Sequence, residues 1–175
     1  TNQYMSPELS IILPSIRNEK LVGVYQSILK STNRSFELII VGPNPLPEEL
    51  QGVSNVKYIK DFGSPIRASQ LGVLIAEGSV ILWSADDALF VEGALDKNVD
   101  LLYSMGASRK NVVVAKYYEG QNGTIKPLQP DSYFKVNQSS WTQSPYISED
   151  YWIFNVAIMH KSYFDELGGW DCSYQ

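Results

Sequence analysis

Two adjacent carboxylates, Asp86 and Asp87, are the residues of this chain best placed to do chemistry. They follow Val80–Trp83, an apolar run rich in β-branched and aromatic side chains, which predicts a strand buried on both faces. In an open α/β sheet, ligands bind just beyond the carboxyl ends of the strands. Two carboxylates there suit a hard divalent ion, Mg²⁺ or Mn²⁺, with a substrate phosphate completing its shell. The alternative is that one Asp caps the following helix and the other is solvated.

The elements expected before residue 88 place this pair on a largely parallel sheet. Strands are predicted at residues 9–13, 36–41, 56–60 and 80–83. Apolar residues recur at helical spacing from residue 21 and again, more loosely, after Pro65. The second of these helices is expected to bury a face formed by Ile66, Leu71, Leu74 and Ile75. Helical crossovers between strands imply parallel pairing, so the predicted fold class is α/β.

The pattern changes beyond residue 88. Helices are predicted at residues 94–105 and 161–167, and strands at 111–118 and 152–159. Gly and Asn at 120–123 predict a hairpin turn. The polar stretch 129–149 is expected to be a long loop that closes over a ligand.

Composition narrows the function classes. The chain has 175 residues, enough for one domain, with 44% hydrophobic residues and 19% charged residues. A net charge of −5 argues against nucleic-acid binding. Cys172 is the only cysteine, so no disulfide forms within the chain and a cytoplasmic location is expected. No apolar run approaches the ~18–20 residues of a membrane span.

Several of these segments together resemble the family 2 glycosyltransferases of the GT-A fold. The opening strand followed by Pro14-Ser15 and an amphipathic helix is similar to the start of that family. The segment Ala76-Glu77-Gly78, the apolar strand and Ser84-Ala85-Asp86-Asp87 resemble its acidic metal motif. The most specific likeness is Gly168-Gly169-Trp170-Asp171, which resembles the family's Gly-Gly-aromatic-Asp segment near the acceptor site.

The resemblance implies a GT-A-like three-layer sandwich with a mostly parallel central sheet, forming one domain over residues 1–175. Residues 1–88 would be the nucleotide-binding lobe and 89–175 an incomplete acceptor lobe. The implied reaction is an inverting, metal-assisted transfer from a UDP- or GDP-sugar to the hydroxyl of a glycan or lipid-linked acceptor, in the cytoplasm or at the inner face of a membrane. The implied nucleotide-binding residues are Pro14, Ser15, Arg17, Arg67 and Asp86. The implied Mn²⁺ or Mg²⁺ ligands are Asp86 and Asp87, and the implied acceptor-binding residues are Gly169, Trp170 and Asp171, with Asp171 as catalytic base.

The chain also departs from the family pattern. An Asp is expected after the second strand, where Gly42-Pro43-Asn44 stands; an Arg is expected at Ser69; and an acid is expected at Ser84. These departures keep open a non-catalytic nucleotide- or sugar-binding domain of the same fold. A nucleotidyltransferase is disfavoured because residues 14–18 contain no glycine. The family's catalytic acids lie beyond the Gly-Gly segment, and only four residues follow Asp171, so we expect a longer native chain and weak transfer by this one.

Overall fold

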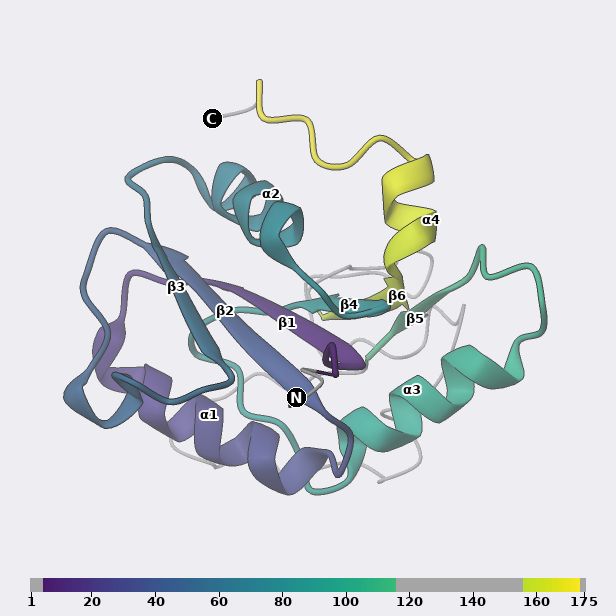
Figure 1. Ribbon diagram of the computed structural model, residues 1–175, viewed down its shortest axis with the longest axis horizontal. Coiled ribbons are helices and arrows are strands. Elements are labelled where there is room, and N and C mark those ends of the chain that lie inside the picture. Colours follow the sequence, from purple (N-terminus) through teal and green to yellow (C-terminus); the bar gives the residue numbers. More distant parts are fainter. Residues whose placement is uncertain (1–4, 116–155, 174–175) are drawn as a thin grey trace, which may run out of the picture.

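A six-stranded sheet in the order β3-β2-β1-β4-β6-β5 forms the centre of the molecule in the computed structural model, which describes residues 5–115 and 156–173 (Figure 1). The strands are β1 (Leu9–Pro14), β2 (Phe36–Gly42), β3 (Val56–Lys60), β4 (Val80–Trp83), β5 (Val112–Val114) and β6 (Ala157–His160). The helices are α1 (Asn18–Ser31), the 3₁₀ turn η1 (Glu48–Leu50), α2 (Pro65–Ile75), α3 (Ala94–Ser104) and α4 (Lys161–Glu166). The first four strands run parallel, and β6 pairs antiparallel with both β4 and β5. The predicted α/β class with a mostly parallel sheet is confirmed.

Three layers result because strand side chains alternate between the two faces. Leu9, Ile11 and Leu13 of β1 pack with α1 and α3 on one face. Ile12 of the same strand packs with α2 and α4 on the other. In Figure 1, α1 and α3 lie below the sheet, and α2 and α4 lie above it.

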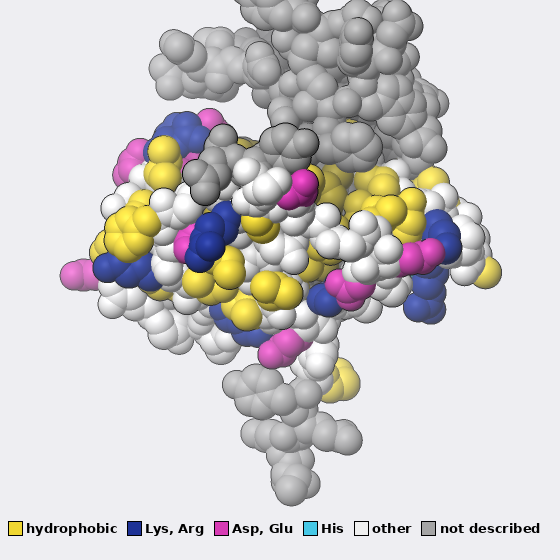
Figure 2. All heavy atoms as spheres, turned by 90° about the horizontal axis from the view of Figure 1, so that it is seen from above, with side chains coloured by type: hydrophobic (Ala, Val, Ile, Leu, Met, Phe, Trp, Pro, Cys, Tyr) yellow, Lys and Arg dark blue, Asp and Glu magenta, His cyan; other side chains and the backbone are white. Residues whose placement is uncertain are grey.

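The buried face of α2 differs from the predicted one. Leu74 is 68% exposed, and the residues that face the sheet are Ala68, Ser69, Gly72 and Val73. A Cβ added to Gly72 would lie 2.5 Å from Ile12 Cγ2, so only small side chains allow the helix to approach the sheet this closely. The sequence prediction chose the large apolar residues of the helix, because a prediction from hydrophobic periodicity takes such residues to point inward. In Figure 2, which looks onto this side, hydrophobic side chains form patches between charged ones.

A buried carboxylate fixes the turn that leads into β4. Glu37 on β2 accepts hydrogen bonds from Ser10 Oγ at 2.5 Å and from the Glu77 backbone N–H at 2.7 Å. Lys57 Nζ on β3 lies 2.7 Å from the same carboxylate. The Gly78 N–H donates to Ser10 Oγ, so side chains of β1 and β2 together hold the backbone that enters β4.

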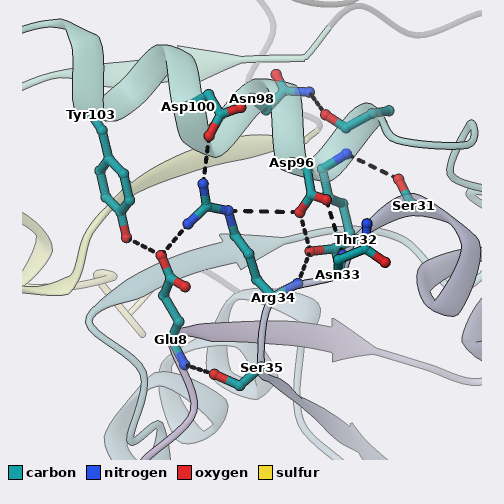
Figure 3. Close-up of polar contacts among 12 residues, drawn as sticks. Glu8, Ser31, Thr32, Asn33, Arg34, Ser35, Asp96, Asn98, Asp100 and Tyr103 are labelled. Atoms are coloured by element: carbon teal, nitrogen blue, oxygen red, sulfur yellow. Dashed lines mark hydrogen bonds and ion pairs between the residues drawn. The ribbon is translucent and has the colours of Figure 1, made fainter.

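An ionic network fastens α3 to the first two strands (Figure 3). The Arg34 guanidinium lies among Glu8, Asp96 and Asp100 and pairs with all three. Glu8 also accepts a hydrogen bond from the Tyr103 hydroxyl at 2.6 Å. Helix α3, which follows the acidic pair, is therefore anchored at the amino-terminal ends of the parallel strands, on the side of the molecule opposite their carboxyl ends.

Element boundaries shift modestly from those predicted. Within the described residues, the predicted strands 111–118 and 152–159 are observed as β5 and β6, which pair with each other. Residues 116–118 and 152–155 lie outside the described residues. The predicted hairpin turn at 120–123 and the loop at 129–149 lie outside the described residues. Within the described ranges, no helix is long and apolar enough to cross a membrane.

Candidate functional site

A pocket of about 350 Å³ opens at the carboxyl ends of the four parallel strands. From β1, the chain adds β2 and β3 on one side and β4 on the other, so the direction in which strands are added reverses between β1 and β4. Open α/β sheets bind ligands at such a topological switch point. Loops after all four strands and the first turns of α2 contribute to its wall. The residues that line it are Pro14, Ser15, Ile16, Arg17, Val41, Gly42, Pro43, Asp61, Gly63, Pro65, Ala68, Ser69, Ser84, Ala85 and Asp86.

Asp86 holds the loop between β1 and α1. Its side chain is 3% exposed. Its Oδ2 accepts hydrogen bonds from Ser15 Oγ at 3.1 Å and from the Ile16 and Arg17 backbone N–H groups, each at 3.0 Å. Its Oδ1 accepts from Arg17 Nε at 2.7 Å and pairs with the same guanidinium a second time. A carboxylate has about four lone-pair sites, so the acceptor capacity of Asp86 is used within the protein.

The charge of Asp86 is stabilised in place. Burial raises the pKa of this carboxyl, but the Arg17 side chain and the two backbone N–H donors outweigh that effect and hold its pKa below the usual range. Asp86 is therefore a buried anion at neutral pH whose counter-charge is Arg17.

Asp87 lies at the surface beside the same arginine. Its side chain is 44% exposed, and its Oδ2 lies 2.9 Å from Arg17 Nη1. Among residues 5–115 and 156–173, no three His, Cys, Asp or Glu side chains form a metal-binding group. A divalent ion fits this donor set in one way, through Asp87 with substrate phosphate oxygens, since Mg²⁺ is commonly held by one or two carboxylates plus phosphates.

Asp61 is a pocket residue that the sequence prediction missed. It follows β3, its side chain is 11% exposed, and its backbone N–H donates to the Gly42 carbonyl at 3.1 Å. Its carboxylate accepts from the Gly63 N–H at 2.9 Å and from Arg67 Nε at 3.0 Å. Arg67, predicted to contact phosphates, is paired with Asp61 at the rim and does not line the pocket. The available signal was the position of Asp61 at the end of a predicted strand.

Ser84 also lines the pocket, at the place where the resembled family has an acid. The residue is 7% exposed, and within the described residues its hydroxyl has no hydrogen-bond partner. Buried hydroxyls are normally paired, and the oxygen of this one is almost completely shielded from solvent.

The Gly-Gly-Trp-Asp segment lies on α2. The Trp170 N–H donates to Gln70 Oε1 at 2.8 Å, and a Cβ on Gly169 would lie 2.7 Å from the same oxygen. The Trp170 ring packs edge-on against Trp83 of β4 with centroids 5.1 Å apart. Asp171 is exposed and accepts two hydrogen bonds from Ser173, which lower its pKa.

The structure thus brings four predicted nucleotide-binding residues, Pro14, Ser15, Arg17 and Asp86, to one pocket. The predicted acceptor residues Gly169, Trp170 and Asp171 are not among the pocket's lining residues.

Comparisons with known proteins show the fold. No protein-family model matches the chain. No curated protein matches it either. Among solved structures, the chain is similar to S. aureus TarS (residues 1–349), with a TM-score of 0.59 and 18% sequence identity. The match covers 94% of this chain and 49% of that one, so the chain spans about half the length of the TarS structure. The fold is glycosyltransferase-like.

Proposed function

We propose that this chain is a glycosyltransferase domain of family 2 type, which moves a sugar from a nucleoside-diphosphate sugar to an acceptor hydroxyl with inversion. The observation that carries the proposal is the pocket at the switch point of the sheet, lined by a carboxylate-anchored loop after β1. The shared fold with TarS, a glycosyltransferase, supports it. Glycan or lipid-linked acceptors, and a site of action in the cytoplasm or at a membrane's inner face, belong to the same proposal.

The nucleotide is expected to lie along the pocket with its diphosphate near Arg17. A guanidinium matches the geometry of phosphate oxygens, and Arg17 is 41% exposed and lines the pocket. Asp86 acts as a positioning residue, because it fixes both the backbone and the side chain of Arg17.

Charge at this end of the pocket favours help from a divalent ion. Asp86 and Asp87 carry two negative charges and Arg17 carries one positive charge, so the three side chains together carry −1 and repel a diphosphate. We propose Asp87 as the ligand of Mn²⁺ or Mg²⁺, with Asp86 joining it only if Arg17 releases an oxygen. A bound ion would supply Lewis-acid stabilisation of the leaving diphosphate.

The acceptor hydroxyl must lose a proton as it attacks the sugar, and Asp171 is the carboxylate proposed to take it. Asp171 is exposed, and Ser173 lowers its pKa, so it is ionised at neutral pH but a weak base. Gln70 positions this segment through the backbone of Trp170.

A non-catalytic nucleotide- or sugar-binding domain is the second candidate. The placement of Asp171, exposed and outside the lining of the pocket, favours it. Both candidates bind a nucleotide in the pocket, so binding alone does not separate them.

Two measurements test the proposal. The first is a thermal-shift assay with UDP and GDP, with and without Mn²⁺. A bound nucleotide should raise the melting temperature, since a ligand at a hundredfold excess over its Kd stabilises the folded protein by about 2.7 kcal/mol. Hydrolysis or transfer of UDP- and GDP-sugars should then be detectable and should fall in Asp171→Asn. Binding without any turnover would support the non-catalytic domain, and the absence of binding would contradict both candidates.

A further inference from the structure

One guanidinium lies between the two carboxylates that follow β4. Arg17 Nε and Nη2 both contact Asp86 Oδ1, and Arg17 Nη1 lies 2.9 Å from Asp87 Oδ2. Because both oxygens lie within hydrogen-bonding distance of one planar group, a small cation at the same place would be within reach of both. The guanidinium therefore stands where two carboxylates can hold one divalent ion.

The two oxygens of Asp86 have separate partners. Oδ2 accepts hydrogen bonds from Ser15 Oγ and from the Ile16 and Arg17 backbone N–H groups, so it holds the loop after β1. Within the described residues, the partner of Oδ1 is the Arg17 side chain alone. If the guanidinium leaves, Oδ1 and the Asp87 carboxylate become available together while Oδ2 still anchors the loop.

Charge prevents the guanidinium and a divalent ion from sharing this place. The two carboxylates carry two negative charges, which a divalent ion neutralises by itself. An ion added beside Arg17 would bring the positive charge to three, and like charges a few ångströms apart repel strongly near a protein surface. Arg17 and the ion therefore compete for the same pair of carboxylates.

A diphosphate gives the guanidinium another partner. Arg17 lines the pocket, and its side chain is partly exposed, so it can turn without disturbing the core. Phosphate oxygens match the forked geometry of the guanidinium and form strong, charge-assisted hydrogen bonds with it. The side chain can thus exchange its carboxylate contacts for phosphate oxygens and stay in the pocket.

We propose that Arg17 closes the metal site of the free protein and that a bound nucleoside diphosphate opens it, an inference that rests on the proposed function. Arg17 turns to the phosphates, and Mn²⁺ or Mg²⁺ takes its place between Asp86 Oδ1 and Asp87. Nucleotide and ion then strengthen each other's binding by the same factor, because coupling between two sites is reciprocal.

Thermal unfolding and titration calorimetry of the whole chain with Mn²⁺, without nucleotide, test the exchange. Mn²⁺ should leave the Tm of the wild type nearly unchanged at concentrations that raise the Tm of Arg17→Met, because the ion replaces the lost positive charge. Mn²⁺ should bind about 5–150-fold more tightly to Arg17→Met than to the wild type, the usual range for coupled sites. NaCl at matched ionic strength should not reproduce the effect.

Two variants are matched controls. Arg17→Lys keeps a positive charge beside the carboxylates, so its affinity for Mn²⁺ should stay near that of the wild type. The double variant Arg17→Met/Asp87→Asn lacks one of the two carboxylates, so the gain in Mn²⁺ affinity should be lost. In the wild type, UDP and Mn²⁺ should each raise the affinity for the other equally, after allowance for the Mn²⁺–UDP complex that forms in solution.

The outcomes separate this inference from the proposed function. Equal Mn²⁺ affinity of the wild type and Arg17→Met, or a gain that persists in the double variant, would overturn the exchange and leave the nucleotide site standing. If Arg17→Met does not fold, the wild type decides, and equal UDP affinity in EDTA and in Mn²⁺ would overturn the coupling. Absence of UDP and GDP binding beside a gain of Mn²⁺ affinity in Arg17→Met would overturn the proposed function and support the competition between Arg17 and the ion.

Discussion

Replacing Asp86 by Asn separates the two roles that a carboxylate can have at this position. In the structure Asp86 anchors the loop after β1, and a ligand of a divalent ion would need an oxygen that is not already engaged. The amide keeps one acceptor for Ser15 and the loop N–H groups but turns an NH₂ group toward the Arg17 guanidinium, so donor faces donor. The variant should therefore lose stability before any ligand is added.

The magnitude follows from burial. Breaking a buried ion pair by removing one partner costs about 3–5 kcal/mol, and the half-exposed Arg17 recovers part of this from water, so we expect about 2–4 kcal/mol. For a domain of this size each kcal/mol lowers the Tm by about 2–4 °C, which gives a decrease of roughly 4–16 °C. Asp87→Asn is the matched control, since an exposed pair contributes about 0–1 kcal/mol and its Tm should change by less than about 4 °C.

The dependence on pH gives a second readout. The pKa of Asp86 in the folded chain lies below its ordinary value of 3.8, so its stabilising effect is present above that value and is lost as the pH falls through the lower, folded-state pKa. Urea unfolding at several pH values should show wild type and Asp86→Asn furthest apart above pH ~4 and converging in stronger acid.

Nucleotide binding completes the test. Asp86→Asn should weaken GDP and UDP binding in EDTA as well as in Mn²⁺, because the loop that carries Arg17 is no longer held. Asp87→Asn should weaken nucleotide binding in Mn²⁺ but leave binding in EDTA unchanged. An Asp86→Asn protein with wild-type stability, whose binding defect appears only in Mn²⁺, would refute the anchoring role and make Asp86 the metal ligand.

Three further changes test the fold around the site. Gly72→Val should lower the free energy of unfolding by about 1–3 kcal/mol in urea titrations, because a Cβ there would lie 2.5 Å from Ile12; an unchanged midpoint would mean that α2 lies further from the sheet. Lys57→Met leaves the buried Glu37 carboxylate without its cation and should lower the Tm, with Lys57→Arg as the milder control. Burial and the Glu8 carboxylate raise the pKa of Tyr103 to about 12, so the associated stability is complete below pH ~10 and is lost as the pH approaches 12; ultraviolet titration against Tyr103→Phe measures this, and a normal tyrosine pKa would contradict it.

The order of elements could be predicted because each carries its own local pattern. The strands β1, β2 and β4 are short, nearly continuous apolar runs, and buried parallel strands have this appearance. The predicted face of α2 was wrong at Leu74 and Ile75, which are exposed, whereas Leu71 packs against the core as predicted. The helix packs so closely on the sheet at Gly72 that small residues form its buried face. A prediction from hydrophobic periodicity instead places large apolar residues on the buried face.

The site was harder to predict because its contacts join distant segments. The adjacent carboxylates were expected to suit a divalent ion. Nothing in the sequence pattern indicates that Arg17, which is 69 residues from Asp86, would pair with Asp86. Asp61 becomes a pocket residue only once β3 is known to lie beside β2, with the Asp61 N–H bonded to the Gly42 carbonyl. An Asp was expected after β2, and the structure supplies a carboxylate from the end of the neighbouring strand instead.

The anchoring of the loop has a consequence for how a diphosphate can be held. The N–H groups of Ile16 and Arg17 point at Asp86, so they are not available to phosphate oxygens. At the start of α2, Pro65 has no N–H, and the Arg67 N–H is taken by the Ser64 hydroxyl. Two features that bind phosphate in other α/β proteins, a loop of free N–H groups and an open helix N-terminus, are thus largely occupied here. Phosphate oxygens must therefore be bound mainly by side chains. We expect the affinity for a diphosphate to depend steeply on Arg17 and on the divalent ion proposed at Asp87.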